Sequence, residues 1–211
     1  MKKLFALLLA AMMLLALAAC GQTEAEETKD VDESAPALVG GWTITEDAAL
    51  TDEAQAAFDK ALDGLTGVGY TPLALLGTQL VSGTNYCILC EAKVVYPDAV
   101  PYYALVYVYA DLQGNAEILD IVILDIGDIA ESGEVHPAAA APEALLGGWR
   151  VDRESDVAVD NVILHLASQA VNGVNHCVLC AGPELVFVYE AADGSCEVTS
   201  RVPLDLGALR G

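Results

Sequence analysis

The sequence predicts an α+β fold: a helix packed on a four-stranded antiparallel meander, followed by a second antiparallel β repeat without a helix. Three observations support it. From Leu76 to Cys90, eight of fifteen positions are identical to those from Leu166 to Cys180. An apolar stripe with helical spacing precedes the first copy alone, within residues 52–63. Alternating apolar segments separated by Gly, Asn, Asp and Pro follow in both copies, which is typical of strands.

The N-terminus has the pattern of a secretion signal. Lys2 and Lys3 precede an unbroken apolar run over residues 4–17, which is too short to span a bilayer as a helix. The run ends in Leu17-Ala18-Ala19-Cys20, which resembles the lipobox of bacterial lipoproteins. That resemblance implies that residues 1–19 are removed and that Cys20 carries a lipid anchoring the protein to the bacterial cell membrane, outside the cytoplasm. The alternative is an ordinary signal peptide followed by a chance cysteine.

Residues 20–37 are acidic and nearly free of large apolar side chains, so we expect a flexible tether. Removal of the two lysines in residues 1–19 would take the formal net charge of the chain from −22 to −24. A surface this acidic repels nucleic acid, which excludes nucleic acid as an expected partner.

The first repeat is expected over residues 38–130. Thr51 is a suitable N-cap for the helix at 52–63. Strands are predicted at 71–79, 84–95, 102–110 and 116–125, and the helix should cover the face that carries Tyr86, Ile88 and Cys90. The other face is also apolar in places, so we expect part of it to be covered as well.

The second repeat is expected over residues 145–211, after an Ala-, Pro- and acid-rich linker at 131–144. Trp149 follows Trp42 by 107 residues, whereas the two hairpins are 90 residues apart, so the second copy lacks about one helix. Its strands are predicted at 162–169, 174–180, 185–190 and 197–204. A sheet without its helix leaves apolar surface in water, so we expect the second sheet to pack against the first.

Two motifs resemble the cystatin superfamily. The hairpin Gln79-x-Val81-x-Gly83-Thr84-Asn85-Tyr86 is similar to that family's Gln-x-Val-x-Gly hairpin, and Leu38-Val39-Gly40-Gly41 is similar to its N-terminal glycine trunk. The order of trunk, helix, hairpin and meander also agrees. The resemblance covers residues 38–125 and, more weakly, 145–205. It implies tandem cystatin-like repeats in a bacterial lipoprotein.

The same resemblance implies reversible inhibition of papain-like cysteine proteases by a wedge that occludes the active site. The implied contacts are Gly40, Gly41, Gln79, Leu80, Val81, Ser82, Gly83 and, in the second turn, Leu112. That turn lacks the Pro-Trp pair of many family members. The second hairpin, with Gln169, Val171 and Gly173, is interpreted as degenerate. The substitutions Val81→Asp and Gly83→Arg are expected to abolish inhibition and leave folding nearly intact. The alternative is a non-inhibitory cell-surface binding or structural lipoprotein.

No catalytic, metal or cofactor site is predicted. The Cys-x-x-Cys pairs at 87–90 and 177–180 lie within strand patterns, where residues three apart point to opposite faces. Core packing is therefore favoured for these thiols, and a disulfide between the copies or a metal site are the alternatives. His136, His165 and His176 have no recognisable catalytic partner in the sequence, and structural roles are favoured. The chain is accordingly not expected to be an enzyme.

Overall fold

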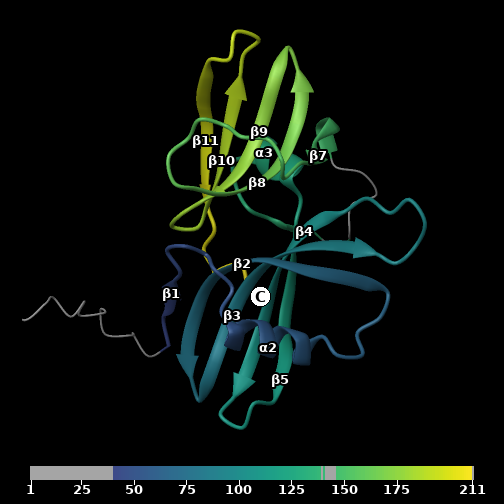
Figure 1. The fold of residues 1–211 in the computed structure, drawn as a ribbon, viewed down its shortest axis with the longest axis vertical. Coiled ribbons are helices and arrows are strands. Elements are labelled where there is room, and N and C mark those ends of the chain that lie inside the picture. The colour runs from purple at the N-terminus through teal and green to yellow at the C-terminus, as the bar shows by residue number, and fades with distance from the viewer. Residues whose placement is uncertain (1–39, 139, 141–145, 211) are drawn as a thin grey trace, which may run out of the picture. The chain divides into compact units, whose positions relative to one another are not determined.

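Two antiparallel sheets make up most of the structure (Figure 1), a computed structural model that describes residues 40–138, 140 and 146–210. In the described residues the first sheet has six strands in the order β1-β2-β3-β4-β5-β6. The described residues are mostly antiparallel sheet with a smaller helical part, which is consistent with the predicted α+β class. The predicted signal peptide, the tether, Cys20, Leu38 and Val39 lie outside the described residues. The strands of the first sheet are β1 (Trp42–Ile44), β2 (Val68–Val81), β3 (Gly83–Val94), β4 (Tyr102–Asp111), β5 (Ala116–Leu124) and β6 (Pro137–Ala138).

The helix α2 (Asp52–Ala61) lies across one face of this sheet (Figure 1). The Thr51 side chain caps it by accepting a hydrogen bond from the Ala54 backbone N–H at 3.2 Å, as predicted. The apolar side of α2, with Ala54, Ala57 and Phe58, forms a buried cluster with Tyr86, Ile88 and Cys90. The predicted helix-covered face is therefore confirmed, although the helix ends two residues before the predicted boundary.

The second sheet has five strands in the described residues, in the order β11-β10-β9-β8-β7. It repeats irregularities of the first. Register shifts occur in β2 between Leu75 and Gly77, and in β8 between His165 and Ala167, ninety positions later. Such conserved bulges re-aim strands at equivalent points, so the repeats share detailed geometry as well as sequence. The strands are β7 (Arg150–Val151), β8 (Val162–Val171), β9 (Gly173–Cys180), β10 (Glu184–Glu190) and β11 (Cys196–Pro203).

One buried core joins the two sheets, which confirms that they pack together. The expected reason for that contact was wrong. The shared core contains Cys87 and Leu89 from the first sheet and Cys177 and Leu179 from the second, so each sheet contributes the face opposite the helix side. The helix side of the second sheet is instead covered by the segment 152–161, whose Val157 and Val159 pack on a small apolar cluster. The buried members of that cluster are Val178, Cys180, Val186 and Val188.

The segment predicted as a linker at 131–144 begins inside a helix. The helix α3 (Ile126–Ser132) follows β5 directly, and β6 pairs with the end of β5. The Asp125 carboxylate caps α3 by accepting from the backbone N–H groups of Gly127 and Asp128. Ile126 and Ile129 are fully buried in the shared core. Part of the predicted linker therefore has regular structure and follows a core element.

Each repeat packs its own copy of one short turn against the other repeat. Leu124-Asp125-Ile126-Gly127 recurs eighty residues later as Leu204-Asp205-Leu206-Gly207. The α3 copy lies against the 3₁₀ turn η1 (Leu146–Gly148) of the second repeat. The second copy lies against the first repeat, where the Tyr107 hydroxyl donates to the Leu206 carbonyl at 3.0 Å. We call these two segments the exchanged turns.

No helix among the described residues is long and apolar enough to cross a bilayer.

Candidate functional site

Three predicted contact segments of the first repeat meet at one end of its sheet. The backbone N–H of Gly40 donates to the Leu80 carbonyl at 3.2 Å, which joins the trunk to the first hairpin. Gly83, at the start of β3, pairs with Asp111, the last residue of β4. The turn that carries Leu112 follows at once. Hydrogen bonding thus gathers the trunk, the hairpin tip and the second turn at the same end, which we call the hairpin end.

Gln79 and Asn85 hold this end together from within. The Gln79 side chain donates to the Gly40 carbonyl at 2.9 Å and accepts from the Asn85 amide at 2.6 Å. The Tyr109 hydroxyl donates to the Ser82 carbonyl at 2.9 Å. The polar residues of the motif therefore satisfy backbone groups of the trunk and of the turn. Gln79 is half-buried.

Gly83 is required by the turn itself. Its φ of +150° lies in a region that residues with side chains rarely adopt. A Cβ at this position would lie 2.2 Å from the Ala110 carbonyl oxygen, which belongs to the backbone of β4. The expectation that Gly83→Arg leaves folding intact is therefore wrong, because the side chain has no room.

Three large apolar side chains are exposed at the hairpin end. Leu80 and Val81 are 48% and 40% exposed, and Leu112 is 82% exposed. Gly40 and Ser82 are also exposed, and Gly41 is half-buried. Exposed apolar side chains at the tips of neighbouring turns can be buried by a protein partner.

The second hairpin reproduces nearly every contact of the first. The Asn175 amide donates to the Gln169 side chain at 2.6 Å, Gln169 donates to the Gly147 carbonyl, and the Tyr189 hydroxyl donates to the Asn172 carbonyl. A Cβ on Gly173 would lie 2.4 Å from a β10 carbonyl oxygen. Val171 is 49% exposed. In its internal geometry, the hairpin interpreted as degenerate matches the first.

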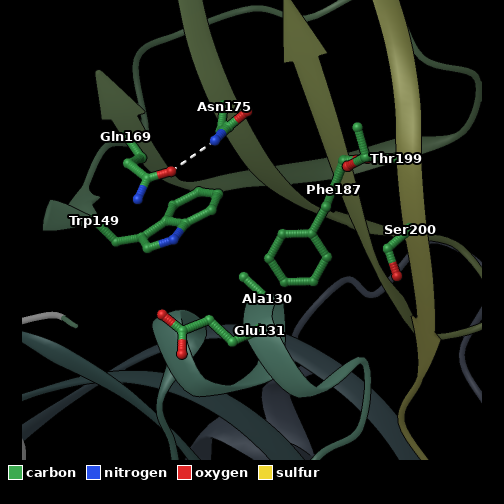
Figure 2. A pocket seen from close by; sticks show the side chains of 8 residues that line it. All are labelled: Ala130, Glu131, Trp149, Gln169, Asn175, Phe187, Thr199 and Ser200. Atoms are coloured by element: carbon green, nitrogen blue, oxygen red, sulfur yellow. Dashed lines mark hydrogen bonds between the residues drawn. The ribbon is translucent and has the colours of Figure 1, made fainter. Parts of the chain in front are cut away.

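A cavity of about 350 Å³ lies beside the second hairpin (Figure 2). Trp149 and Phe187 line this cavity and pack edge-on against each other, with ring centroids 5.7 Å apart. Trp42 and Tyr107 form the same pair in the first repeat at 5.6 Å, and there the tyrosine hydroxyl binds the exchanged turn. Phe187 has no hydroxyl to do so. The remaining lining residues are Ala130, Glu131, Gln169, Asn175, Thr199 and Ser200.

The Cys-x-x-Cys pairs divide between the two faces of their strands. Cys87 and Cys177 lie in the shared core, whereas Cys90 and Cys180 lie on the opposite faces, and each of the four is a buried free thiol. Burial raises the pKa of Cys87 to about 12 and raises the pKa of the other three. The prediction of core packing is confirmed for these residues. Cys196 on β11 is exposed.

Sequence reasoning missed two features. The exchanged turns were detectable as the repeated Leu-Asp-x-Gly, at an offset of eighty rather than ninety residues. The contact between His165 and His176 had no sequence signal of its own, because it joins neighbouring strands next to a bulge.

Comparisons with known proteins identify no relative: no family model, no curated protein and no solved structure matches the chain.

Proposed function

We propose that the chain is a cystatin-like lipoprotein whose first repeat inhibits papain-like cysteine proteases by inserting the hairpin end into the active-site cleft. The observation that carries this proposal is the set of hydrogen bonds that gathers the trunk, the first hairpin and the second turn at one end of the sheet. The strand order, with one helix between β1 and β2, agrees with the resemblance.

The exposed side chains suit such a contact. Leu80, Val81 and Leu112 offer apolar surface, and Val81 is stiff at χ1, so its burial costs little side-chain entropy. The backbone beneath them is fixed by Gln79 and Tyr109, which reduces the ordering cost of binding. Anchorage through a lipid on Cys20 belongs to the same proposal and rests on the Leu17-Ala18-Ala19-Cys20 pattern.

Titration of papain with the purified full chain tests the inhibitor proposal. We expect reversible inhibition at or below micromolar protein, and at least about a tenfold weaker inhibition with Val81→Asp, because the new carboxylate would be buried without a partner. Val171→Asp is the matched control: it places the same charge on the equivalent tip of the second hairpin and should inhibit like the parent chain. Absence of inhibition by the parent chain at micromolar concentration would refute the proposal.

A second candidate is a non-inhibitory binding or structural lipoprotein on the same fold. It is favoured by the duplication of the Gln, Asn and Gly contacts, which gives the motif a structural purpose in both hairpins. On this alternative, Val81→Asp and Val171→Asp behave alike, and neither changes the activity of papain.

A further inference from the structure

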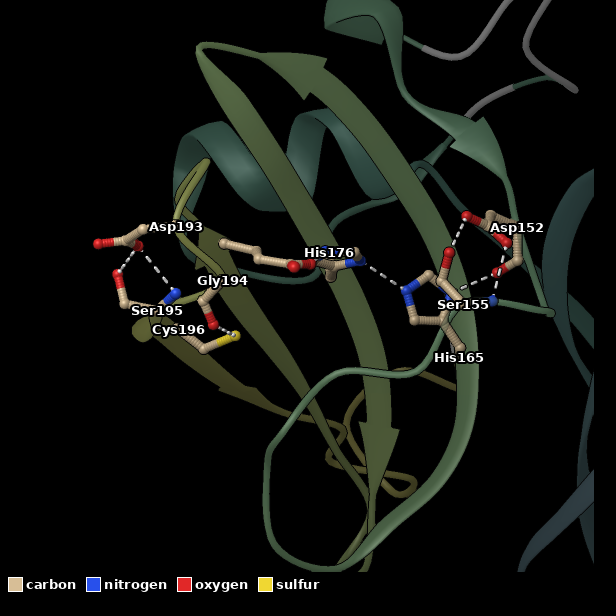
Figure 3. Close-up of polar contacts among 9 residues, drawn as sticks. Asp152, Ser155, His165, His176, Asp193, Gly194, Ser195 and Cys196 are labelled. Carbon is tan, nitrogen blue, oxygen red and sulfur yellow. Dashed lines mark hydrogen bonds and ion pairs between the residues drawn. The ribbon is translucent and has the colours of Figure 1, made fainter.

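Two buried histidines and a glutamate form a row of hydrogen-bonding side chains across the second sheet, which we call the polar row. His165 Nε2 on β8 lies 3.0 Å from His176 Nδ1 on β9, and His176 Nε2 lies 3.0 Å from Glu190 Oε2 on β10. At the other end, His165 Nδ1 contacts the backbone carbonyl of Asp152, which begins the covering segment 152–161 (Figure 3). Both imidazoles are buried, and the Glu190 side chain is 36% exposed.

The polar row has no equivalent in the first repeat. Its three members replace residues that pack beneath or beside α2 in the first repeat, where the equivalents are Leu75, Tyr86 and Ala110. The polar row thus lies on the face of the second sheet that corresponds to the face covered by α2 in the first. The contact between His165 and the Asp152 carbonyl joins this row to the segment 152–161, which covers the sheet in place of a helix.

The number of protons on the two imidazoles decides how many of the three contacts can be hydrogen bonds. A carbonyl and an ionised carboxylate only accept hydrogen bonds, so the two ends supply no proton. Three contacts between them need three protons: one toward Glu190, one between the rings and one toward Asp152. Two neutral imidazoles carry two. One contact is then left with an acceptor facing an acceptor, which is unfavourable at a buried site.

We propose that His165, His176 and Glu190 form a binding site for one proton, and that this proton completes the attachment of the segment 152–161. With one proton added to two neutral imidazoles and an ionised carboxylate, all three contacts are hydrogen bonds. A further proton would make both rings donors and break the contact between them. The site is therefore complete with one added proton and incomplete with none or two.

The charged side chains near the two rings either have a hydrogen-bond or ion-pair partner of their own or line a neighbouring cavity. The Asp152 carboxylate accepts from the Ser155 hydroxyl at 2.7 Å, and Arg153 pairs with Glu91 at 3.5 Å. Asp156 lines a cavity of about 340 Å³ that also borders His165. On the same face, Val178, Val186 and Val188 are apolar, and burial raises the pKa of Cys180, so that it stays uncharged. Beyond Cys180, Glu184 pairs with Arg201. Cys196 of β11 lies opposite Glu190 and is exposed.

Glu190→Gln is an isosteric test of the proton count. The glutamine amide can donate to His176 Nε2, His176 Nδ1 then donates to His165 Nε2, and His165 Nδ1 donates to the Asp152 carbonyl. All three bonds now form with two neutral imidazoles. The added proton is therefore needed by the parent chain and redundant in the variant. Glu190→Ala, which removes the end contact, leaves two contacts for two protons and has the same consequence.

The experiment measures imidazole ¹⁵N shifts and amide hydrogen exchange of the full chain between about pH 5 and about pH 9, the range around the ordinary titration of imidazole. For the parent chain we expect uptake of one proton by the pair as pH falls, with higher protection factors in residues 152–161 over the same range, after correction for the intrinsic pH dependence of amide exchange. Glu190→Gln and Glu190→Ala should show constant protection there, because two neutral rings already supply every remaining hydrogen bond. Glu197→Gln removes a charge from an exposed position on β11 and should behave as the parent does.

Three results would overturn the proposal: two neutral rings in the parent chain throughout this range, protection of residues 152–161 in the parent chain that is independent of pH, or a parent-like pH dependence of that protection in either Glu190 variant. Because Glu190→Gln and Glu190→Ala are judged separately, failure of one to fold leaves the other decisive.

Discussion

Gly83 and Gly173 show how single residues fix the hairpins. Each has a positive φ, and each lies so close to a backbone oxygen of the next strand that a Cβ has no space. The phenol ring of Tyr109 or Tyr189 covers the glycine, and its hydroxyl holds the turn. The glycine therefore allows close packing within the sheet, in addition to any approach by a partner.

Replacement of Gly83 by alanine should cost at least about 3 kcal/mol of unfolding free energy, because backbone strain and a steric clash add. Gly114→Ala is the control. Its φ is +79° but nothing lies within 4 Å of the added Cβ, so strain alone should cost about 1 kcal/mol. Urea denaturation followed by far-UV circular dichroism measures both. Equal losses would contradict the steric explanation.

Sequence reasoning reached some residue roles and not others. The roles of Thr51 and of the four strand cysteines follow from local spacing, so they were predictable. The pairing of His165 with His176 depends on strand register and on the bulge after His165. Register at a bulge is set by tertiary packing, and no single-strand pattern encodes it.

Among the elements, long periodic segments were predicted and short ones were not. The helix α2 and the eight main strands follow from apolar spacing. The strands β1, β6 and β7 have two or three residues each, so they carry too little pattern and depend on distant pairing partners. The helix α3 was missed: the predicted strand ends at 125 and the predicted linker begins at 131, and no element was predicted between them, although Asp125 is a typical cap.

Strand alternation also predicts the reactivity of the thiols. Cys87, Cys90, Cys177 and Cys180 are buried with raised pKa values, so the reactive thiolate is scarce and screened from reagents. In the native chain at neutral pH, iodoacetamide should modify Cys196 at least about a hundredfold faster than these four, and urea should remove the difference. Peptide mass mapping identifies the modified sites. Comparable native rates at Cys196 and Cys87 would contradict this arrangement of the strands.

At the scale of the molecule, the two repeats depend on each other. Their sheets share one core, and the Tyr103 hydroxyl in the first repeat donates to the Leu166 carbonyl in the second at 2.6 Å. The packing of the sheets was predictable from apolar strand faces. The choice of faces was not, because the sequence does not reveal that residues 152–161 cover the side without a helix.

Tyr103→Phe should lower the stability of both repeats together by about 1 kcal/mol, because it removes a buried hydrogen bond between them. The Leu166 carbonyl keeps its second donor, the Asp152 backbone N–H at 2.9 Å. Tryptophan fluorescence and far-UV circular dichroism should give one coincident urea transition, displaced equally by the substitution. Tyr96→Phe, at a position 53% exposed, is the control and should leave the transition unchanged. Separate transitions for the two signals would indicate repeats that unfold independently.

The exchanged turns have a consequence for the order in which the chain is made. The first repeat receives its closing contact from Leu206, ninety-nine positions after Tyr107. A ribosome adds residues from the N-terminus, so the hairpin end of the first repeat emerges well before the segment that completes its aromatic pair. Until residue 206 is available, Trp42 and Tyr107 lack that cover. A part of the fold that is synthesised early is therefore completed by a segment of the second repeat.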